Sequence, residues 1–151
     1  TSIFIGNEEK HMANYDQKNY NKNKPIQTPK PCEMLVEEDY VQRAERVIKG
    51  LDGKLTTSQI RNILSMINQL YNDVIMTPSE TLSQEVQSQL RYLKVKIIYA
   101  AGRKTEVKRF VEASQIDQLI DHVGSSRKNF ILYTHYMEAL VAYHRFYDGR
   151  D

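Results

Sequence analysis

The sequence predicts an all-α fold, a compact bundle of five to six helices that follows a disordered N-terminal tail. Glycine and proline together supply only ten of the 151 residues, which is too few for the tight turns of an all-β sandwich. From Glu37 onward, apolar residues recur at helical spacing. The first 36 residues lack that spacing. We therefore expect a tail over residues 1–36 and a helical domain over residues 37–151.

The predicted tail is polar and carries three prolines between Asn7 and Pro31. Such a segment buries too little apolar surface to offset the entropy of ordering the chain. Thr1–Lys10 has no long apolar stretch of the kind found in signal peptides. No apolar run approaches the roughly 20 residues that span a membrane. With Cys32 as the single cysteine, the sequence predicts a soluble, cytoplasmic protein without disulfides or a membrane partner.

Helix-end signals define the first two helices. Acidic residues at positions 37–39 favour a helix start at Glu37, because the helix dipole stabilises negative charge there, and Gly50 ends that helix. The second helix opens with a capping box, in which Thr56 and Gln59 each satisfy the other's backbone amide. We expect it to end at Met76, before Thr77-Pro78.

The third helix is predicted to start near Thr81, with Gln84 completing a second capping-box pattern, and to stop at Gly102. Its stretch Lys94–Tyr99 is rich in β-branched residues, which favour strands, but the longer apolar period favours a helix. Short helices follow near 107–111 and over 116–123.

The last helix is predicted to run from about Arg127 to Tyr147 and is apolar around most of its circumference. Such a helix lies either at the centre of the bundle or against a partner. Both interpretations stay open at this stage.

Positive charge is concentrated in one stretch, although the formal net charge is only +2. From Arg91 to Arg109 there are seven basic residues and one acidic residue, a local charge of +6. From Phe110 to Asp151, six acidic residues outnumber four basic ones. This segregation gives one face a positive potential despite the near-neutral total.

A helical projection groups four of the residues in or beside that stretch on one narrow arc, away from the apolar stripe. We call this arc the ridge; it consists of Tyr92, Lys96, Tyr99 and Arg103. Cations bind phosphates, and aromatic rings stack on bases of any sequence at about 1–3 kcal/mol per base. The ridge therefore favours binding of single-stranded nucleic acid. The alternative is a tyrosine stripe that packs on a neighbouring helix beside a merely solvated charge run.

The second helix adds a polar face suited to phosphate and sugar contacts. It consists of Arg61, Ser65, Asn68 and Asn72.

No phosphate-binding loop, nucleophile motif or metal-ligand motif occurs in the sequence. The sequence therefore predicts no enzyme, no cofactor and no metal site. His135 and Glu138 share a helix face, but they reverse the Glu-x-x-His order of di-iron bundles. One catalytic alternative is a ribonuclease with His135 or His144 as general base. No acid partner is assigned to either histidine.

Three stretches resemble the small subunit of the type III-A CRISPR–Cas (Csm) effector complex. They are LTTSQIRN at 55–62, YLKVK at 92–96 running into AAGR at 100–103, and YMEALVAYHRFY at 136–147. The resemblance covers nearly all of Tyr40–Asp151 and leaves the first 36 residues outside it. None of the three stretches is a catalytic signature.

The resemblance implies a non-catalytic helical scaffold that stacks in several copies and binds the RNA backbone without sequence specificity. Cleavage would belong to other subunits. The implied partners are guide RNA, target RNA, the large subunit, the backbone subunits and further copies of the chain. By position, the implied RNA contacts are Arg61, Lys94, Lys96 and Arg103, whereas Tyr92 and Tyr99 rest on the projection alone. The alternative is a helical adaptor that binds only proteins.

Overall fold

The structure, a computed structural model, describes residues 31–147. The helices in this range are α2 (Tyr40–Lys49), α3 (Thr57–Met76), α4 (Gln84–Arg103), α5 (Thr105–Ser114), α6 (Ile116–Val123) and α7 (Arg127–Tyr147). The described range contains no strand, only an isolated antiparallel bridge between Thr81 and Ser126. The all-α prediction is confirmed.

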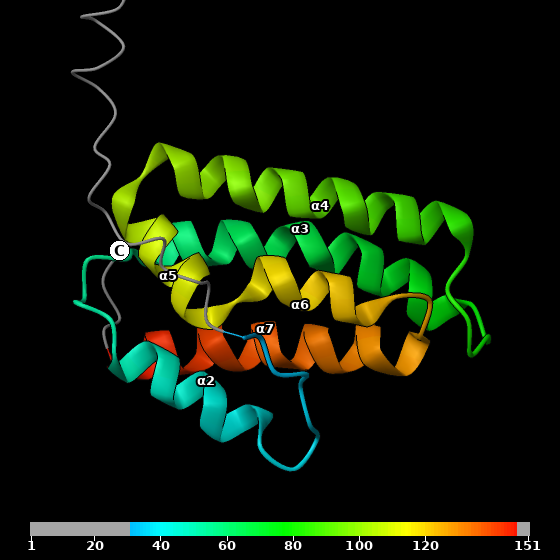
Figure 1. Cartoon of the computed structure of the whole chain (residues 1–151), viewed down its shortest axis with the longest axis horizontal. Coiled ribbons are helices and arrows are strands. Elements are labelled where there is room, and N and C mark those ends of the chain that lie inside the picture. The colour runs from blue at the N-terminus through cyan, green and yellow to red at the C-terminus, as the bar shows by residue number, and fades with distance from the viewer. Residues whose placement is uncertain (1–30, 148–151) are drawn as a thin grey trace, which may run out of the picture. The chain divides into compact units, whose positions relative to one another are not determined.

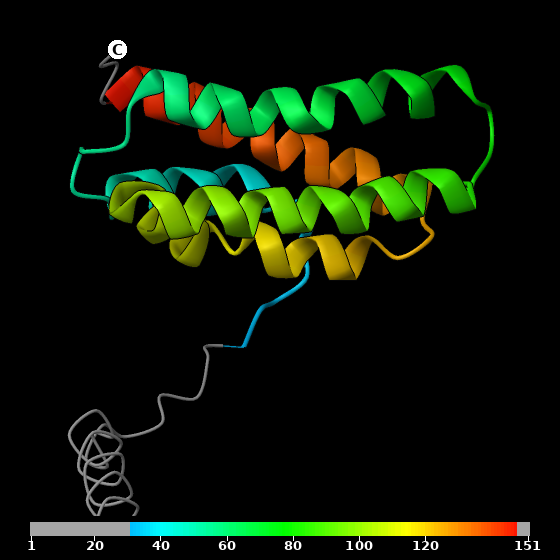
Figure 2. The ribbon, with the colours of Figure 1, turned by 90° about the horizontal axis from the view of Figure 1, so that it is seen from above.

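The helix α7 lies at the centre of the bundle and packs against α2, α3 and α6. Helix α4 packs against α3, α5 and α6, and it forms one edge of the bundle (Figure 1). Seen from above, α3 and α4 run side by side over the length of the bundle and are joined by a loop at one end (Figure 2). None of the described helices is both long and apolar enough to cross a membrane.

Aromatic residues of α7 form the middle of the core. Phe130, Tyr133 and Tyr136 are at most 1% exposed. The hydroxyl of Tyr133 donates to the carbonyl of Ile116 at 2.8 Å, and that of Tyr136 donates to the carbonyl of Ser114 at 2.9 Å. Burial raises the pKa of Tyr136 to about 12. Of the two interpretations of this helix, the structure shows the central one for most of its length.

The two tyrosine hydroxyls stabilise the joint between α5 and α6. The chain reverses there at Gln115, which has a left-handed φ of 59°, a conformation uncommon for residues other than glycine. Phenylalanine at either position of α7 would remove a buried hydrogen bond to a carbonyl next to Gln115. The α5–α6 corner therefore depends on α7.

The capping box predicted for the second helix is confirmed. The backbone amide of Gln59 donates to Thr56 Oγ1 at 3.2 Å, and the amide of Thr56 donates to Gln59 Oε1 at 3.0 Å. Helix α3 ends at Met76 as predicted.

Three predicted helix ends are wrong. Residues 37–39 form a turn, and α2 begins at Tyr40. Helix α4 is capped by Ser83, whose hydroxyl accepts from the amide of Val86, and not by Thr81. The reason is that Leu82 is buried and its amide donates to Ser125, which fixes this loop against the next one. Gly102 does not stop α4, which continues through Arg103.

The compact unit begins at Cys32, five residues before the predicted boundary at Glu37. Cys32 and Leu35 are partly buried against the core, and burial raises the pKa of the Cys32 thiol. The guanidinium of Arg43 donates to the carbonyl of Glu33 at 2.8 Å. The rest of the predicted disordered tail, residues 1–30, lies outside the described residues, as do residues 148–151.

Candidate nucleic-acid interface

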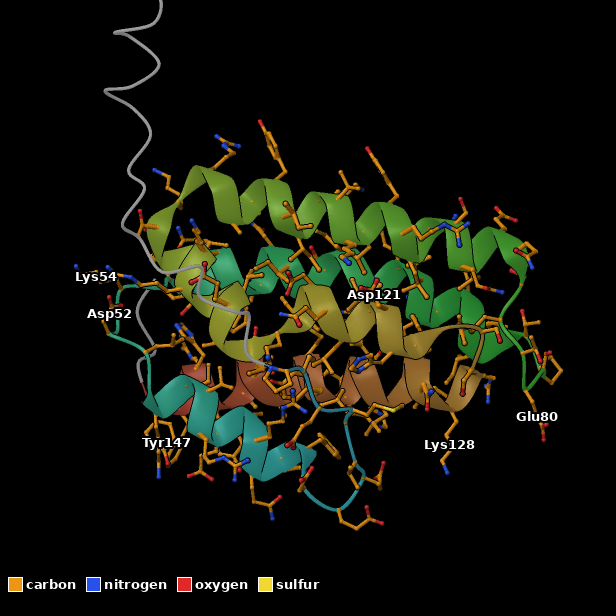
Figure 3. All side chains as sticks on the ribbon, in the orientation of Figure 1. Asp52, Lys54, Glu80, Asp121, Lys128 and Tyr147 are labelled. Carbon is orange, nitrogen blue, oxygen red and sulfur yellow. The ribbon has the colours of Figure 1, made fainter. Side chains whose placement is uncertain are left out.

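All four ridge residues lie on the solvent side of α4. Tyr92 and Tyr99 are 61% and 67% exposed, and Lys96 and Arg103 are exposed as well. Side chains project outward along this edge of the bundle (Figure 3). The opposite side of α4 is anchored in the core by Leu90, Leu93 and Ile97. The predicted exposure of the ridge is confirmed.

Each cation of the ridge lies over a tyrosine ring one turn earlier in α4. Lys96 Nζ is 4.8 Å from the centre of the Tyr92 ring, and Arg103 Cζ is 5.8 Å from that of Tyr99. Both distances are typical of cation–π pairs. The two pairs are seven residues apart, which corresponds to about 10 Å along a helix. Rings and cations therefore alternate in a row.

Within the described residues, no acidic side chain forms a salt bridge with the ridge cations. Within residues 31–147, the salt bridges are Lys49–Glu45, Lys94–Asp121 and Arg109–Asp52. Lys96 and Arg103 take part in none of them. Exposed cations without carboxylate partners are free to bind the phosphates of a nucleic acid.

A groove of about 680 Å³ separates the ridge from α3. Its α4 wall is the ridge together with Val95 and Ala100, and Lys104 and Val107 lie at one end. Its α3 wall is formed by Gln59, Asn62, Ile63 and Met66. A second hollow of about 250 Å³ shares Met66, Tyr92 and Lys96 with the first and extends to Gln69, Asp73 and Gln89. The two linings combine apolar groups with amides and cations, and Asp73 adds a carboxylate to the second hollow.

The α3 wall is fixed against α5 by Gln59. Its amide Nε2 donates to Glu106 Oε1 at 2.8 Å, while its Oε1 completes the capping box. The hydrogen bond from Gln59 holds the pKa of the Glu106 carboxyl below its usual value. Glu106, the one acidic residue between Arg91 and Arg109, therefore holds the α3 wall of the groove in position.

Two of the six predicted contact residues do not line the groove. Lys94 Nζ lies 2.7 Å from Oδ2 of Asp121 (labelled in Figure 3), so this lysine is directed to α6. Arg61 is exposed on α3 but is absent from both hollows. The same holds for the other members of its polar face, Ser65, Asn68 and Asn72.

The sequence interpretation missed the amide and thioether groups of the α3 wall, Gln59, Asn62 and Met66. These residues flank the buried stripe of α3. The helical period identifies both flanks of that stripe, but only the packing of α3 beside α4 decides which of them borders the groove.

The two histidines of the ribonuclease alternative lie outside the groove. His144 is 1% exposed, and its Nε2 lies 2.7 Å from the carbonyl oxygen of Leu55. His135 is half-buried beside Tyr40, with ring centres 6.4 Å apart. Among residues 31–147, no three His, Cys, Asp or Glu side chains are grouped so that they could hold a metal ion.

Fold and groove together define a small all-α protein with an exposed groove of cations and aromatic rings. Comparison with known proteins gives the family. Residues 35–150 match the family described as "Csm2 Type III-A". This chain belongs to that family, the small subunits of type III-A CRISPR complexes.

Relatives from three organisms carry the name "CRISPR system Cms protein Csm2". The protein of Mycobacterium tuberculosis is 35% identical over 122 residues, which cover 78% of this chain and 98% of the relative. The protein of Streptococcus thermophilus is 40% identical over 124 residues, with the same two coverages. That of Enterococcus italicus is 45% identical over 99 residues, 64% of this chain and 71% of the relative. Family membership makes other subunits of the type III-A complex its partners.

Proposed function

We propose that this chain is a non-catalytic, cytoplasmic subunit that binds the backbone of guide and target RNA without sequence specificity. The observation that carries this proposal is the pair of exposed Tyr–cation contacts, Tyr92–Lys96 and Tyr99–Arg103, whose cations form no salt bridge within residues 31–147. Stacking on tyrosine accepts any base, and phosphate contacts carry no sequence information. The amides of Asn62 and Gln69 supply further donors for phosphate and sugar oxygens.

A single copy is expected to bind RNA weakly because it offers few phosphate contacts. Several copies along one strand would raise the affinity through effective concentration. The partners in this proposal are guide RNA, target RNA, the large and backbone subunits and further copies of the chain.

The two ends of the bundle support stacking of copies head to tail. At one end, Phe146 is 77% exposed and Tyr147 is 42% exposed, and Lys54 and Asp52 lie on the same side of the view as Tyr147 (Figure 3). At the other end, Met76 is 81% exposed. The α3–α4 segment at that end, residues 73–85, holds three acidic residues and no basic one. Both ends therefore present exposed apolar side chains, and a head-to-tail contact between them would form either a closed ring or an open filament.

Phe146→Ala is expected to weaken self-association about tenfold or more, since a large exposed ring at the centre of a contact is a typical hot spot. Met76→Ala should act in the same direction from the opposite end. Ile98→Ala is the control, because Ile98 is 51% exposed but lies within α4. Sedimentation of the purified full chain over a concentration series gives the dissociation constant for self-association of each variant. If the three variants and the wild type have the same dissociation constant, the two ends of the bundle do not form the interface.

Lys96→Ala and Arg103→Ala test the RNA contact. Each is expected to weaken binding about equally for unrelated single-stranded RNA sequences. Each should also reduce the slope of log affinity against log salt by about 0.7, the value for one lost phosphate contact on a single strand. Fluorescence anisotropy with labelled RNA at several salt concentrations measures both effects. Lys128→Ala is the control, because Lys128 is an exposed cation of α7 outside the groove. If the salt slope of a variant is unchanged, the substituted residue does not contact RNA.

The alternative, an adaptor that binds only proteins, is favoured by the exposed apolar residues of α4. Val95 and Ile98 are 59% and 51% exposed beside the ridge. An adaptor predicts no RNA binding by the full chain at any salt concentration.

A further inference from the structure

Gly102 has neither a backbone conformation nor a close contact that requires glycine. Gly53 and Gly124 have φ values of 76° and 56°, which favour glycine, and Gly50 forms the C-cap of α2. Gly102 is the second-to-last residue of α4, which ends at Arg103 and is capped by Lys104. Glycine destabilises helices relative to alanine. A residue with a side chain, such as alanine, would therefore stabilise the fold more than glycine does at this position.

Space does not explain this glycine either. A Cβ added at Gly102 would meet no heavy atom within 4 Å beyond its chain neighbours and the nearby backbone of its own helix. The position is exposed. The missing side chain therefore leaves a notch that is open to solvent.

The notch adjoins one of the two Tyr–cation pairs. Gly102 directly precedes Arg103 and lies three residues after Tyr99, so all three share one turn of α4. Arg103 Cζ lies over the Tyr99 ring at 5.8 Å. Gly102 does not itself line the groove, but it lies within one helical turn of an aromatic ring and a guanidinium that do.

We propose that Gly102 is a positioning residue that admits the sugar–phosphate backbone of RNA to close contact with α4. The phosphate then reaches Arg103 while the adjacent base stacks at Tyr99. This inference rests on the proposed RNA-binding function and deepens it by assigning the point of closest approach. A side chain at Gly102 would hold the strand away from both groups.

The surrounding charge identifies the approaching group as a polyanion rather than a second helix. After Glu85, α4 contains no acidic residue, and Gly102 is followed by Arg103 and Lys104. Neither cation takes part in a salt bridge within residues 31–147. A phosphate backbone matches this combination of a notch and two cations.

Gly102→Ala and Gly102→Leu in the full chain test the proposal through two opposed readouts. Gly102→Ala is expected to raise the melting temperature by about 2–5 °C, because it removes the helix penalty of glycine without a clash. The affinity for labelled single-stranded RNA should nevertheless fall, and Gly102→Leu should lower it about tenfold, as expected for overpacking of a contact. A more stable protein that binds less tightly cannot be attributed to misfolding.

Ala113→Leu is the matched control, since it adds bulk at an exposed position of α5 outside the groove. If both Gly102 variants bind RNA with wild-type affinity while Lys96→Ala and Arg103→Ala bind it more weakly, the role of Gly102 is overturned. The proposed function is left intact by that result. Absence of RNA binding by the wild type would instead contradict the proposed function itself. Weakened self-association with unchanged RNA affinity would also overturn the inference, because it would assign the notch to a protein contact.

Discussion

The double variant Lys96→Glu/Arg103→Glu is expected to lose RNA binding about 25-fold or more at about 0.1 M salt. Two lost phosphate contacts correspond to about 1.4 decades of affinity under these conditions, at about 0.7 decade each. The new carboxylates also repel the phosphates. The fold should persist because both side chains are exposed and lie outside every salt bridge within residues 31–147. Circular dichroism checks the fold, and anisotropy with labelled RNA gives the affinity.

The double variant Arg46→Glu/Lys128→Glu is the control that distinguishes a local contact at the ridge from an effect of net charge. Both double variants change the formal net charge from +2 to −2, but Arg46 and Lys128 are exposed on α2 and α7, away from the groove. The control should retain most of the wild-type affinity. If both double variants lose binding equally, the ridge has no special role and attraction is a property of the whole surface.

Phe110→Ala is expected to destabilise the protein by about 3–5 kcal/mol, the usual cost of removing a buried phenylalanine side chain. Phe110 on α5 is 0% exposed, and α5 packs against α4, α2 and α6. Because small domains have a total stability of about 5–15 kcal/mol, this loss takes a large share. Chemical denaturation followed by circular dichroism measures it.

Phe146→Ala is the matched control for Phe110→Ala, since the same atoms are removed from a side chain that is 77% exposed. Its stability should change by no more than about 0.5 kcal/mol. A similar loss in both variants would show that burial at α5 does not hold the bundle together.

Local signals predicted much of the fold. The capping box at Thr56 and the end of α3 at Met76 depend on neighbouring residues and are confirmed. The start of α4 depends on the contact between Leu82 and Ser125, 43 positions further along the chain, which no local pattern reveals. The central position of α7 followed from its apolar circumference only as one of two interpretations, and packing against three helices decided it.

The candidate site was predictable where a single helix determines it. Helical period alone placed Tyr92, Lys96, Tyr99 and Arg103 on one exposed side of α4, and the structure confirms that placement. It did not reveal that Asp121, 27 residues away, engages Lys94. The α3 wall of the groove could not be predicted from the sequence either, because it depends on how α3 and α4 pack. Contact of the ridge with RNA stays a prediction.

The most direct test of that contact is ultraviolet crosslinking of the assembled complex with bound guide and target RNA, followed by mass spectrometry. The RNA-binding account predicts nucleotide adducts on Tyr92 or Tyr99, and none on Tyr147, which is exposed at the end of α7. Adducts confined to Tyr147, or an α4 without adducts in a complex that holds RNA, would contradict the account and favour the protein-only adaptor.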